Sequence, residues 1–190
     1  MRTLLLFRGA PGCGKSTYIK EHNLEQYVLS ADTLRLMCQS AQETPAGQME
    51  ISPQNDDVVW EMLFKLLEVR MSHGEFTVID ATNSKTVEMN RYKNLAKQYR
   101  YRMYVIDMTD LPIEECKRRN AQREWLKRVP EAAIDKMYAR FATQKVPSGV
   151  TVLPSTTDVM SDLNYCPNDF NQWKKIHVIG DVHGCYTCLS

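Results

Sequence analysis

A glycine-rich stretch near the N-terminus, residues 9–16, constrains this chain more than any other feature. It reads Gly-Ala-Pro-Gly-Cys-Gly-Lys-Ser and fits the P-loop pattern G-x-x-x-x-G-K-[ST]. The apolar run at residues 3–8 leads directly into it and predicts a buried strand, and a helix is expected to begin at about Lys15 or Ser16. Glycines let such a loop turn tightly, so that its backbone N–H groups and the start of the helix surround a polyphosphate. The stretch therefore predicts a nucleoside triphosphate site.

The loop also predicts which residues hold the nucleotide. Lys15 is expected to reach the β- and γ-phosphates, and the Ser16 hydroxyl is expected to bind Mg²⁺, or Mn²⁺ in its place. ATP or another nucleoside triphosphate would be the phosphate donor. The predicted nucleotide-binding residues in this part of the chain are Gly12, Cys13, Gly14, Lys15, Ser16 and Thr17.

Length and composition exclude several classes of protein. With 190 residues, 43% apolar and 25% charged, the chain suits one globular domain and a tail. No apolar run approaches the roughly 20 residues that span a bilayer, and a P-loop stands where a signal peptide would be cleaved. Six cysteines without a framework spacing indicate reduced thiols. We therefore expect a cytoplasmic protein that is not associated with a membrane.

The net charge of +1 is too small to attract nucleic acid to the whole molecule, but basic residues gather in two places. One cluster consists of Lys117, Arg118, Arg119, Arg123, Lys127 and Arg128. The other consists of Arg91, Lys93, Lys97, Arg100 and Arg102. For the second cluster a solvated helix face and an RNA-binding surface both remain open.

Strand-like and helical segments alternate along the chain. Apolar runs predict strands at residues 3–8, 27–30, 76–80 and 101–108, and helical spacing predicts helices at 58–71, 86–99, 112–125 and 130–142. This alternation is typical of an α/β fold with a central parallel sheet and helices on both faces. Residues 38–54 are expected to form a loop or a short irregular helix, and residues 156–175 a linker that ends a first domain at residues 1–155.

Polar residues at the ends of two predicted strands are candidates for the chemistry. Asp32 follows the second strand, at the sheet edge where open α/β sheets bind ligands, and Arg35 lies one helical turn later. A carboxylate there can accept a proton from a hydroxyl group, and an arginine can hold a phosphate. The alternative makes Asp32 the N-cap of the next helix and Arg35 a surface residue.

The third strand ends in Asp80, followed by Thr82 and Asn83. Asp80 stands where a Walker-B carboxylate usually does, and the two short polar side chains could position an acceptor. Turn or cap roles are the alternative for Asp80 and Asn83. Asp107, which ends another apolar strand, competes for the Walker-B role.

The first basic cluster falls in a predicted helical lid at residues 112–128. Arg119 and Arg123 are four residues apart and are expected on one helix face. A lid of this kind places arginines over a triphosphate, stabilises the charge on the transferring group and excludes water.

Four motifs together resemble the 5′-hydroxyl polynucleotide kinases of phage and bacterial RNA-repair enzymes. They are Gly-Ala-Pro-Gly-Cys-Gly-Lys-Ser-Thr, Ser-Ala-Asp-Thr-Leu-Arg, Ile-Asp-Ala-Thr-Asn and Arg-Asn-Ala-Gln-Arg. The resemblance covers about residues 1–155 and implies a P-loop kinase with a helical lid. It implies that Lys15, Asp32, Arg35 and Arg123 are catalytic, with Asp32 as the general base for the 5′-hydroxyl group. It also implies that Arg119 binds the nucleotide and that Arg35, Asp80, Thr82 and Asn83 bind the acceptor.

The C-terminal residues 176–190 carry a separate motif, Gly-Asp-x-His-Gly. It resembles the opening of binuclear metallophosphoesterases, in which the residues equivalent to Asp181 and His183 bind metal. We expect these residues to be the truncated start of a phosphatase domain, which would follow the kinase domain in the full-length protein.

The sequence therefore predicts a kinase that phosphorylates 5′-hydroxyl ends of RNA or DNA during end repair. A kinase of a small hydroxyl metabolite and a nucleotide-dependent RNA-binding switch remain as alternatives. The preferred nucleic acid and the oligomeric state, with a homodimer among the options, are left open.

Overall fold

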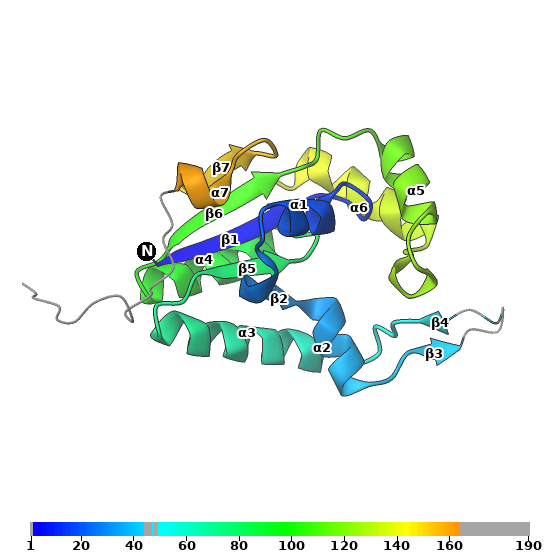
Figure 1. Cartoon of the computed structure of the whole chain (residues 1–190), viewed down its shortest axis with the longest axis horizontal. Helices are drawn as coiled ribbons and strands as arrows, with labels where there is room; N and C mark the ends of the chain where they lie inside the picture. The colour runs from blue at the N-terminus through cyan, green and yellow to red at the C-terminus, as the bar shows by residue number, and fades with distance from the viewer. Residues whose placement is uncertain (1, 44–46, 48, 164–190) are drawn as a thin grey trace, which may run out of the picture.

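The computed structural model describes residues 2–43, 47 and 49–163 of the chain. Its centre is a five-stranded sheet in the order β2-β5-β1-β6-β7, in which all neighbouring strands are parallel (Figure 1). The strands are β1 (Thr3–Arg8), β2 (Val28–Ser30), β5 (Thr77–Asp80), β6 (Arg102–Asp107) and β7 (Thr151–Pro154). The predicted α/β fold with a parallel central sheet is confirmed.

β1 occupies the middle of the sheet because its side chains are buried on both faces. Leu4 and Leu6 belong to one core cluster, whereas Leu5 and Phe7 belong to the other. Successive side chains of a strand point to opposite faces, so a strand covered on both sides reads as a continuous apolar run. This burial fixes the end of β1, and with it the start of the P-loop, at the centre of the sheet edge.

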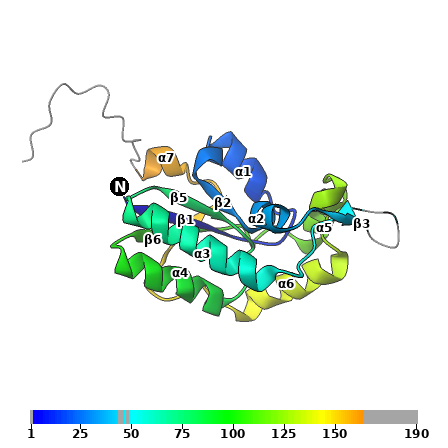
Figure 2. The ribbon, with the colours of Figure 1, turned by 90° about the horizontal axis from the view of Figure 1, so that it is seen from below.

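Helices cover both faces of the sheet. α2 (Ala31–Cys38), α3 (Asp56–Ser72) and α4 (Thr86–Gln98) contribute to the core on one face, and α1 (Lys15–Glu21) and α7 (Val159–Asp162) contribute to the core on the other (Figure 2). After β6, α5 (Ile113–Ala121) and α6 (Glu131–Thr143) pack against each other. None of the helices in residues 2–43 and 49–163 is long and apolar enough to cross a membrane.

Helix α3 begins and ends close to the predicted positions. Its buried face repeats at helical spacing through Val59, Leu63 and Leu67, as the amphipathic pattern requires. Asn55 is its N-cap, and the chain leaves it at Gly74, whose φ of 77° favours glycine. The first turn of α3 therefore lies at a defined place beside α2, which it contacts.

Three segments differ from the sequence prediction. Residues 38–54 contain a two-stranded hairpin, β3 (Gln42–Glu43) with β4 (Met49–Glu50), instead of the predicted loop or irregular helix. β7 adds an edge strand whose half-exposed side chains gave no periodic signal. The expected linker begins with residues that pack on α1, because the Tyr18 hydroxyl donates to the carbonyl of Thr157 and Val159 is fully buried.

The remainder of that expected linker and the tail at 176–190, with Asp181 and His183, lie outside the described residues.

Candidate active site

The glycine-rich loop joins β1 to α1 and encloses the ammonium group of a lysine. α1 begins at Lys15 after Gly14, whose φ of 108° lies in the left-handed region that favours glycine. Nζ of Lys15 donates to the carbonyl oxygens of Gly9 and Ala10, each at 2.9 Å. These bonds hold the ends of the loop together around a positive charge.

The loop packs closely against the base of α5. A Cβ atom on Gly12 would lie 2.2 Å from the carbonyl oxygen of Cys116, so no larger residue fits there without moving the backbone. Cys13 is buried in the core behind the loop and does not line the cavity described below. The close contact at Gly12 therefore packs the P-loop directly on α5, the helix in which the predicted lid begins.

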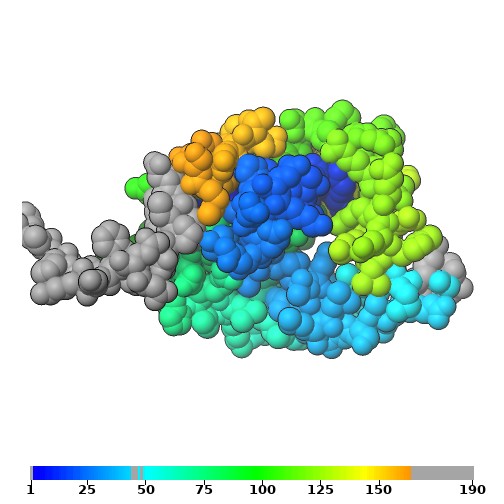
Figure 3. Space-filling model, viewed as in Figure 1, coloured from blue at the N-terminus to red at the C-terminus, as the bar shows by residue number. Residues whose placement is uncertain are grey.

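A cavity of about 470 Å³ opens beside the loop, at the carboxyl edge of the sheet. Figure 3 shows the hollow between the blue segment that carries the P-loop and the green segment that carries α5. The cavity brings together most of the predicted site residues: Gly12, Gly14, Lys15, Ser16, Thr17, Asp32, Arg35, Asp80, Thr82, Arg119 and Arg123. Ligands of open α/β sheets bind at this edge.

α2 carries a carboxylate and a guanidinium group into this cavity. The side chain of Ser30 caps the helix by accepting a bond from the backbone N–H of Thr33 at 3.4 Å, so Asp32 is not the N-cap. Arg35 donates to Oδ1 of Asp32 at 2.6 Å and to Oδ1 of Asp56, at the start of α3, at 2.7 Å. The second bond fixes the arginine from another helix.

The charge of Arg35 is stabilised in place. Burial opposes the charged form, but the bond to Asp56 and the negative charges of Asp56 and Asp32 outweigh it and raise the pKa of Arg35. The side chain of Arg35 is 17% exposed, whereas that of Asp32 is 60% exposed. A fixed cation therefore lies beside a carboxylate that solvent and ligands can reach.

Asp80 ends β5 and faces the same cavity. Burial raises the pKa of Asp80, the Lys15 ammonium opposes this shift, Asp32 adds to it, and Arg123 opposes it. The charged groups of the P-loop, α2 and the lid thus act on one carboxylate. Next to it, the carbonyl of Thr82 accepts a bond from the backbone N–H of Gly9 at 3.2 Å, which ties the end of β5 to the P-loop.

Asn83 is placed differently from the other predicted acceptor residues. It is 3% exposed, does not line the cavity, and donates through Nδ2 to the carbonyl of Phe7 at 2.6 Å. Its φ of 44° is one that asparagine tolerates better than most residues. In this position Asn83 shapes the turn after β5 and presents no side-chain atom to the cavity.

Ser16 and Asp80 are candidates to hold a divalent cation. Both line the cavity and offer oxygen atoms, which Mg²⁺ prefers. Within the described ranges 2–43 and 49–163, no group of three or more histidine, cysteine and acidic side chains could hold a metal on its own. This set suits a cation that takes most of its ligands from nucleotide phosphates and water.

The lid differs from the predicted continuous helix. α5 ends at Ala121, so Arg119 lies in its last turn while Arg123 lies in the loop that follows, and the two do not share a helix face. Asn120 explains the early end: its Nδ2 donates to the carbonyl of Val129 at 2.8 Å, and its Oδ1 accepts from the N–H of Val129 at 3.1 Å. This pair of bonds closes the loop and turns Arg123 into the cavity wall.

Arg119 is held by its own helix, since its Nε donates to Glu115 at 2.6 Å. Bonds from Arg118 and Arg119 lower the pKa of Glu115 to about 2. The carboxylate therefore stays charged at neutral pH and keeps Arg119 beside the P-loop.

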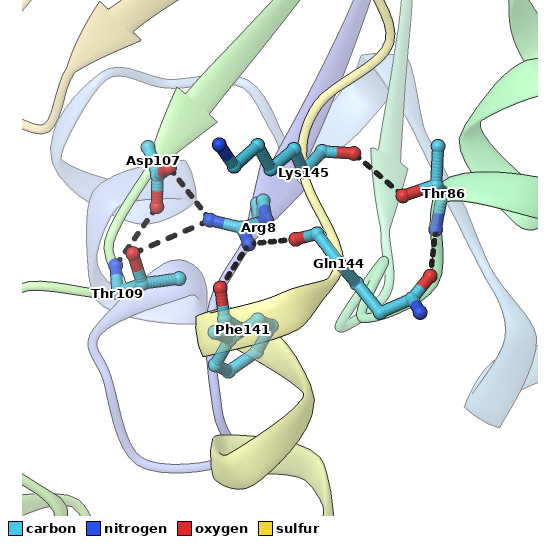
Figure 4. A network of polar contacts seen from close by, with 7 residues as sticks. All are labelled: Arg8, Thr86, Asp107, Thr109, Phe141, Gln144 and Lys145. Carbon is cyan, nitrogen blue, oxygen red and sulfur yellow. Dashed lines mark hydrogen bonds and ion pairs between the residues drawn. The ribbon is translucent and has the colours of Figure 1, made fainter.

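Asp107, the other candidate for the Walker-B role, does not line the cavity. It accepts a bond from Arg8 at 2.8 Å, and Arg8 also donates to the carbonyls of Phe141 and Gln144 at the end of α6 (Figure 4). Gln144 in turn accepts from the N–H of Thr86 at the start of α4. This buried network anchors the end of α6 to β1 and β6 and leaves Asp80 as the strand-end carboxylate of the cavity.

Sequence reasoning missed an apolar wall of the cavity. Trp60 of α3, Met137 of α6 and Val129, which lies before α6, line it together with the charged groups. Because they come from segments far apart in the sequence, no local pattern joined them. No local pattern predicts the bond between Asp56 and Arg35 either, because it depends on the packing of α2 on α3.

The second basic cluster lies on α4, on β6 and, at Arg100, in the turn between them, and none of its residues lines this cavity. The guanidinium of Arg91 lies 4.1 Å from the ring centre of Phe64, and Nζ of Lys93 donates to the carbonyl of Ser148 at 2.8 Å. These two cations therefore support packing between neighbouring elements.

The sequence profile of a family described as an AAA domain matches residues 4–144, which include every site residue discussed above. A comparison with curated proteins found no match.

Solved structures share the fold. A protein from Chloroflexus aurantiacus assigned as a kinase has a TM-score of 0.58 and 17% identity, covering 80% of this chain and 86% of that chain. A sugar kinase from Janibacter has a TM-score of 0.52 and 17% identity, covering 82% and 86%. A chain of a Pnkp1/Rnl/Hen1 complex has a TM-score of 0.50 and 25% identity, covering 62% of this chain and 38% of that chain. The fold is that of a P-loop kinase.

Proposed function

The chain belongs to the AAA domain family, and we propose that it transfers the γ-phosphate of ATP, or of another nucleoside triphosphate, to the 5′-hydroxyl end of RNA or DNA. The family and the P-loop kinase fold support phosphoryl transfer in general. The choice of acceptor rests on the residues of α2.

The observation that carries this choice is the Asp32–Arg35 pair in the same cavity as Lys15. A 5′-terminal nucleotide offers a hydroxyl group and, a short distance away, the phosphodiester of the next linkage. A base and a fixed cation side by side suit these two groups. Oδ1 of Asp32 is bonded to Arg35, which leaves Oδ2 for the hydroxyl proton. The bond to Asp56 keeps Arg35 in place while the acceptor enters.

The proposed step is an in-line displacement. Asp32 takes the proton of the 5′-hydroxyl group while the oxygen of that hydroxyl group forms a bond to the γ-phosphorus. At the same time the bond between the γ-phosphorus and the β–γ bridging oxygen breaks, which releases the nucleoside diphosphate. Lys15, Arg119 and Arg123 stabilise the negative charge on the transferring group. The Asn120–Val129 bonds hold Arg123 in the wall and help exclude water. Ser16 and Asp80 would hold a magnesium ion together with the nucleotide, and such an ion would neutralise further charge on the phosphates.

The biological setting that we propose is nucleic-acid end repair in the cytoplasm. The similarity to a chain of the Pnkp1/Rnl/Hen1 complex supports it, as does the Gly-Asp-x-His-Gly motif of residues 176–190, which would open a phosphatase domain in a full-length protein.

Asp32→Asn tests the proposal, since it removes the base and keeps the size of the side chain. We expect the turnover of 5′-hydroxyl oligonucleotide with γ-labelled ATP to fall by about 100-fold or more. ATP affinity, measured by titration, should change little because Lys15 and the loop are untouched. Asp57→Asn is the matched control, because Asp57 is an exposed carboxylate at the start of α3 that does not line the cavity.

Full transfer by Asp32→Asn would exclude Asp32 as the base. Equal losses in Asp32→Asn and Asp57→Asn would show a general effect of charge.

A further inference from the structure

The loop between α5 and α6 exposes a tryptophan beside an arginine. Trp125, the first residue of η2 (Trp125–Lys127), is 53% exposed, and the guanidinium of Arg128 lies 4.2 Å from its ring centre. Nε of Arg128 also donates to the carbonyl of Arg123 at 2.7 Å. The ring and the guanidinium are therefore fixed relative to a residue that lines the active-site cavity.

The exposure of Trp125 does not come from a loose loop. The two bonds between Asn120 and Val129 close the loop at its ends, and the stack on Arg128 holds the ring from within. An exposed aromatic ring on an ordered frame contributes little to the core, whereas aromatic and arginine side chains dominate binding surfaces. Its position in a kinase lid then decides what it would bind.

One end of the lid lies near the nucleotide site and the other end lies near the acceptor site. Arg119 is on the donor side, where its Nη1 lies 4.0 Å from a Cβ built on Gly14 of the P-loop. Arg123 lines the same cavity as Asp80. η2 contacts β4 of the hairpin that follows α2, the helix of Asp32 and Arg35 (Figure 1). Trp125 and Arg128 are thus at the acceptor end.

The charges differ along the same loop. Lys127 pairs with Glu124 and Arg118 pairs with Glu115, whereas no carboxylate pairs with Arg128 in the part of the chain that the structure describes. A cation without a carboxylate partner, stacked on an exposed ring, matches the two repeating groups of a single-stranded nucleic acid, its phosphates and its bases.

We propose that Trp125 and Arg128 bind the acceptor strand on the 3′ side of its terminal nucleotide, with Trp125 stacking on a base and Arg128 contacting a phosphate. The inference rests on the proposed function. It makes an oligonucleotide, as opposed to a mononucleotide, the preferred acceptor, and it predicts little base preference because every base has a face on which to stack.

Trp125→Ala tests this site with acceptors of increasing length, from a nucleoside 3′-phosphate to a single-stranded octamer. We expect KM for the octamer and its Kd by fluorescence anisotropy to rise by about 10-fold. KM for the nucleoside 3′-phosphate should stay within about twofold, since that acceptor ends before the site. Trp125→Phe should retain most of the affinity, and Val87→Ala, at an exposed apolar residue of α4, is the control for loss of surface area.

A loss of the same size for every acceptor length would mean that Trp125 only supports the lid, and would overturn the inference. Unchanged octamer affinity would also overturn it, and Trp125 would then be free to serve a protein partner. If the wild-type protein binds the octamer through Trp125 but phosphorylates no acceptor, the proposed function fails while the binding site stands.

Discussion

At the scale of single residues, the cavity combines positively and negatively charged side chains that hold one another in place. Lys15 bonds to the loop that carries it, Arg35 is held between Asp32 and Asp56, and Asp80 is buried close enough to both signs of charge for its pKa to respond to them. A carboxylate whose burial raises its pKa destabilises the folded protein when it is charged, and such groups are concentrated at functional sites. We therefore expect the charged Asp80 carboxylate to lower the stability of the folded protein.

Asp80→Asn should stabilise the protein without nucleotide at neutral pH. Because the pKa of Asp80 is higher in the folded state than in the unfolded state, the folded state binds the proton more tightly, and stability falls as the pH rises between the two values. The Asp80→Asn variant has no carboxyl group at this position and therefore does not lose stability in this way as the pH rises. Its Tm should exceed that of the wild type at pH 7, and the difference should shrink as the pH is lowered to about 3, below the pKa of about 3.9 that an aspartate has in an unfolded chain.

Thermal unfolding at the two pH values checks this expectation. A lower Tm for Asp80→Asn at pH 7, or a difference that does not depend on pH, would contradict it.

At the scale of elements, the sequence identified those whose signal is local. β1 and α3 could be predicted because a strand buried on both faces is continuously apolar and an amphipathic helix repeats at its own period. The hairpin β3–β4 and the edge strand β7 could not, because their exposed side chains carry no such pattern. The end of α5 at Ala121 depends on the Asn120–Val129 bonds, which only the folded chain brings together.

The residues of the candidate site likewise fall into those that local sequence patterns predict and those that they do not. Lys15, Asp32 and Asp80 could be predicted to meet because each follows a parallel strand, and such ends share one edge of the sheet. Trp60 and Met137 could not, because their places in the wall depend on how helices pack. Asn83 stands in the predicted motif, but its side chain is buried because the turn after β5 uses it to bind the carbonyl of Phe7.

Arg8 of β1 bonds to the end of β6 and to the end of α6, so its removal should lower the stability of the fold. Arg8→Met would remove the donor to Oδ2 of Asp107 and to the carbonyls of Phe141 and Gln144. Breaking such a largely buried network by removing one partner should lower the free energy of unfolding by about 2–4 kcal/mol. Arg118→Met, which removes an exposed cation, should change it by less than about 0.5 kcal/mol.

Urea denaturation of both variants measures these differences. Equal, small changes would mean that the Arg8 network does not hold α6 to the sheet.

At the scale of the whole molecule, the charge distribution and the position of the cavity both indicate a binding site at the carboxyl edge of the sheet. With a net charge of +1, the chain can attract a polyanion only through local groups, and the cavity collects Lys15, Arg35, Arg119 and Arg123 from the P-loop, α2 and the lid. The described part of the chain thus joins a P-loop to a cavity wall that carries the Asp32 carboxylate and the fixed Arg35 guanidinium. This arrangement is the one that the proposed transfer from a nucleotide donor to a hydroxyl acceptor requires.

The most direct measurement of the central claim is a competition among acceptors. The wild-type protein, with magnesium and γ-labelled ATP, is offered a 5′-hydroxyl oligonucleotide, the same oligonucleotide with a 5′-phosphate, a sugar acid and adenylyl sulfate. The account predicts label on the 5′-hydroxyl oligonucleotide alone, at its 5′ end. Label on the sugar acid or adenylyl sulfate, with none on the oligonucleotide, would contradict it.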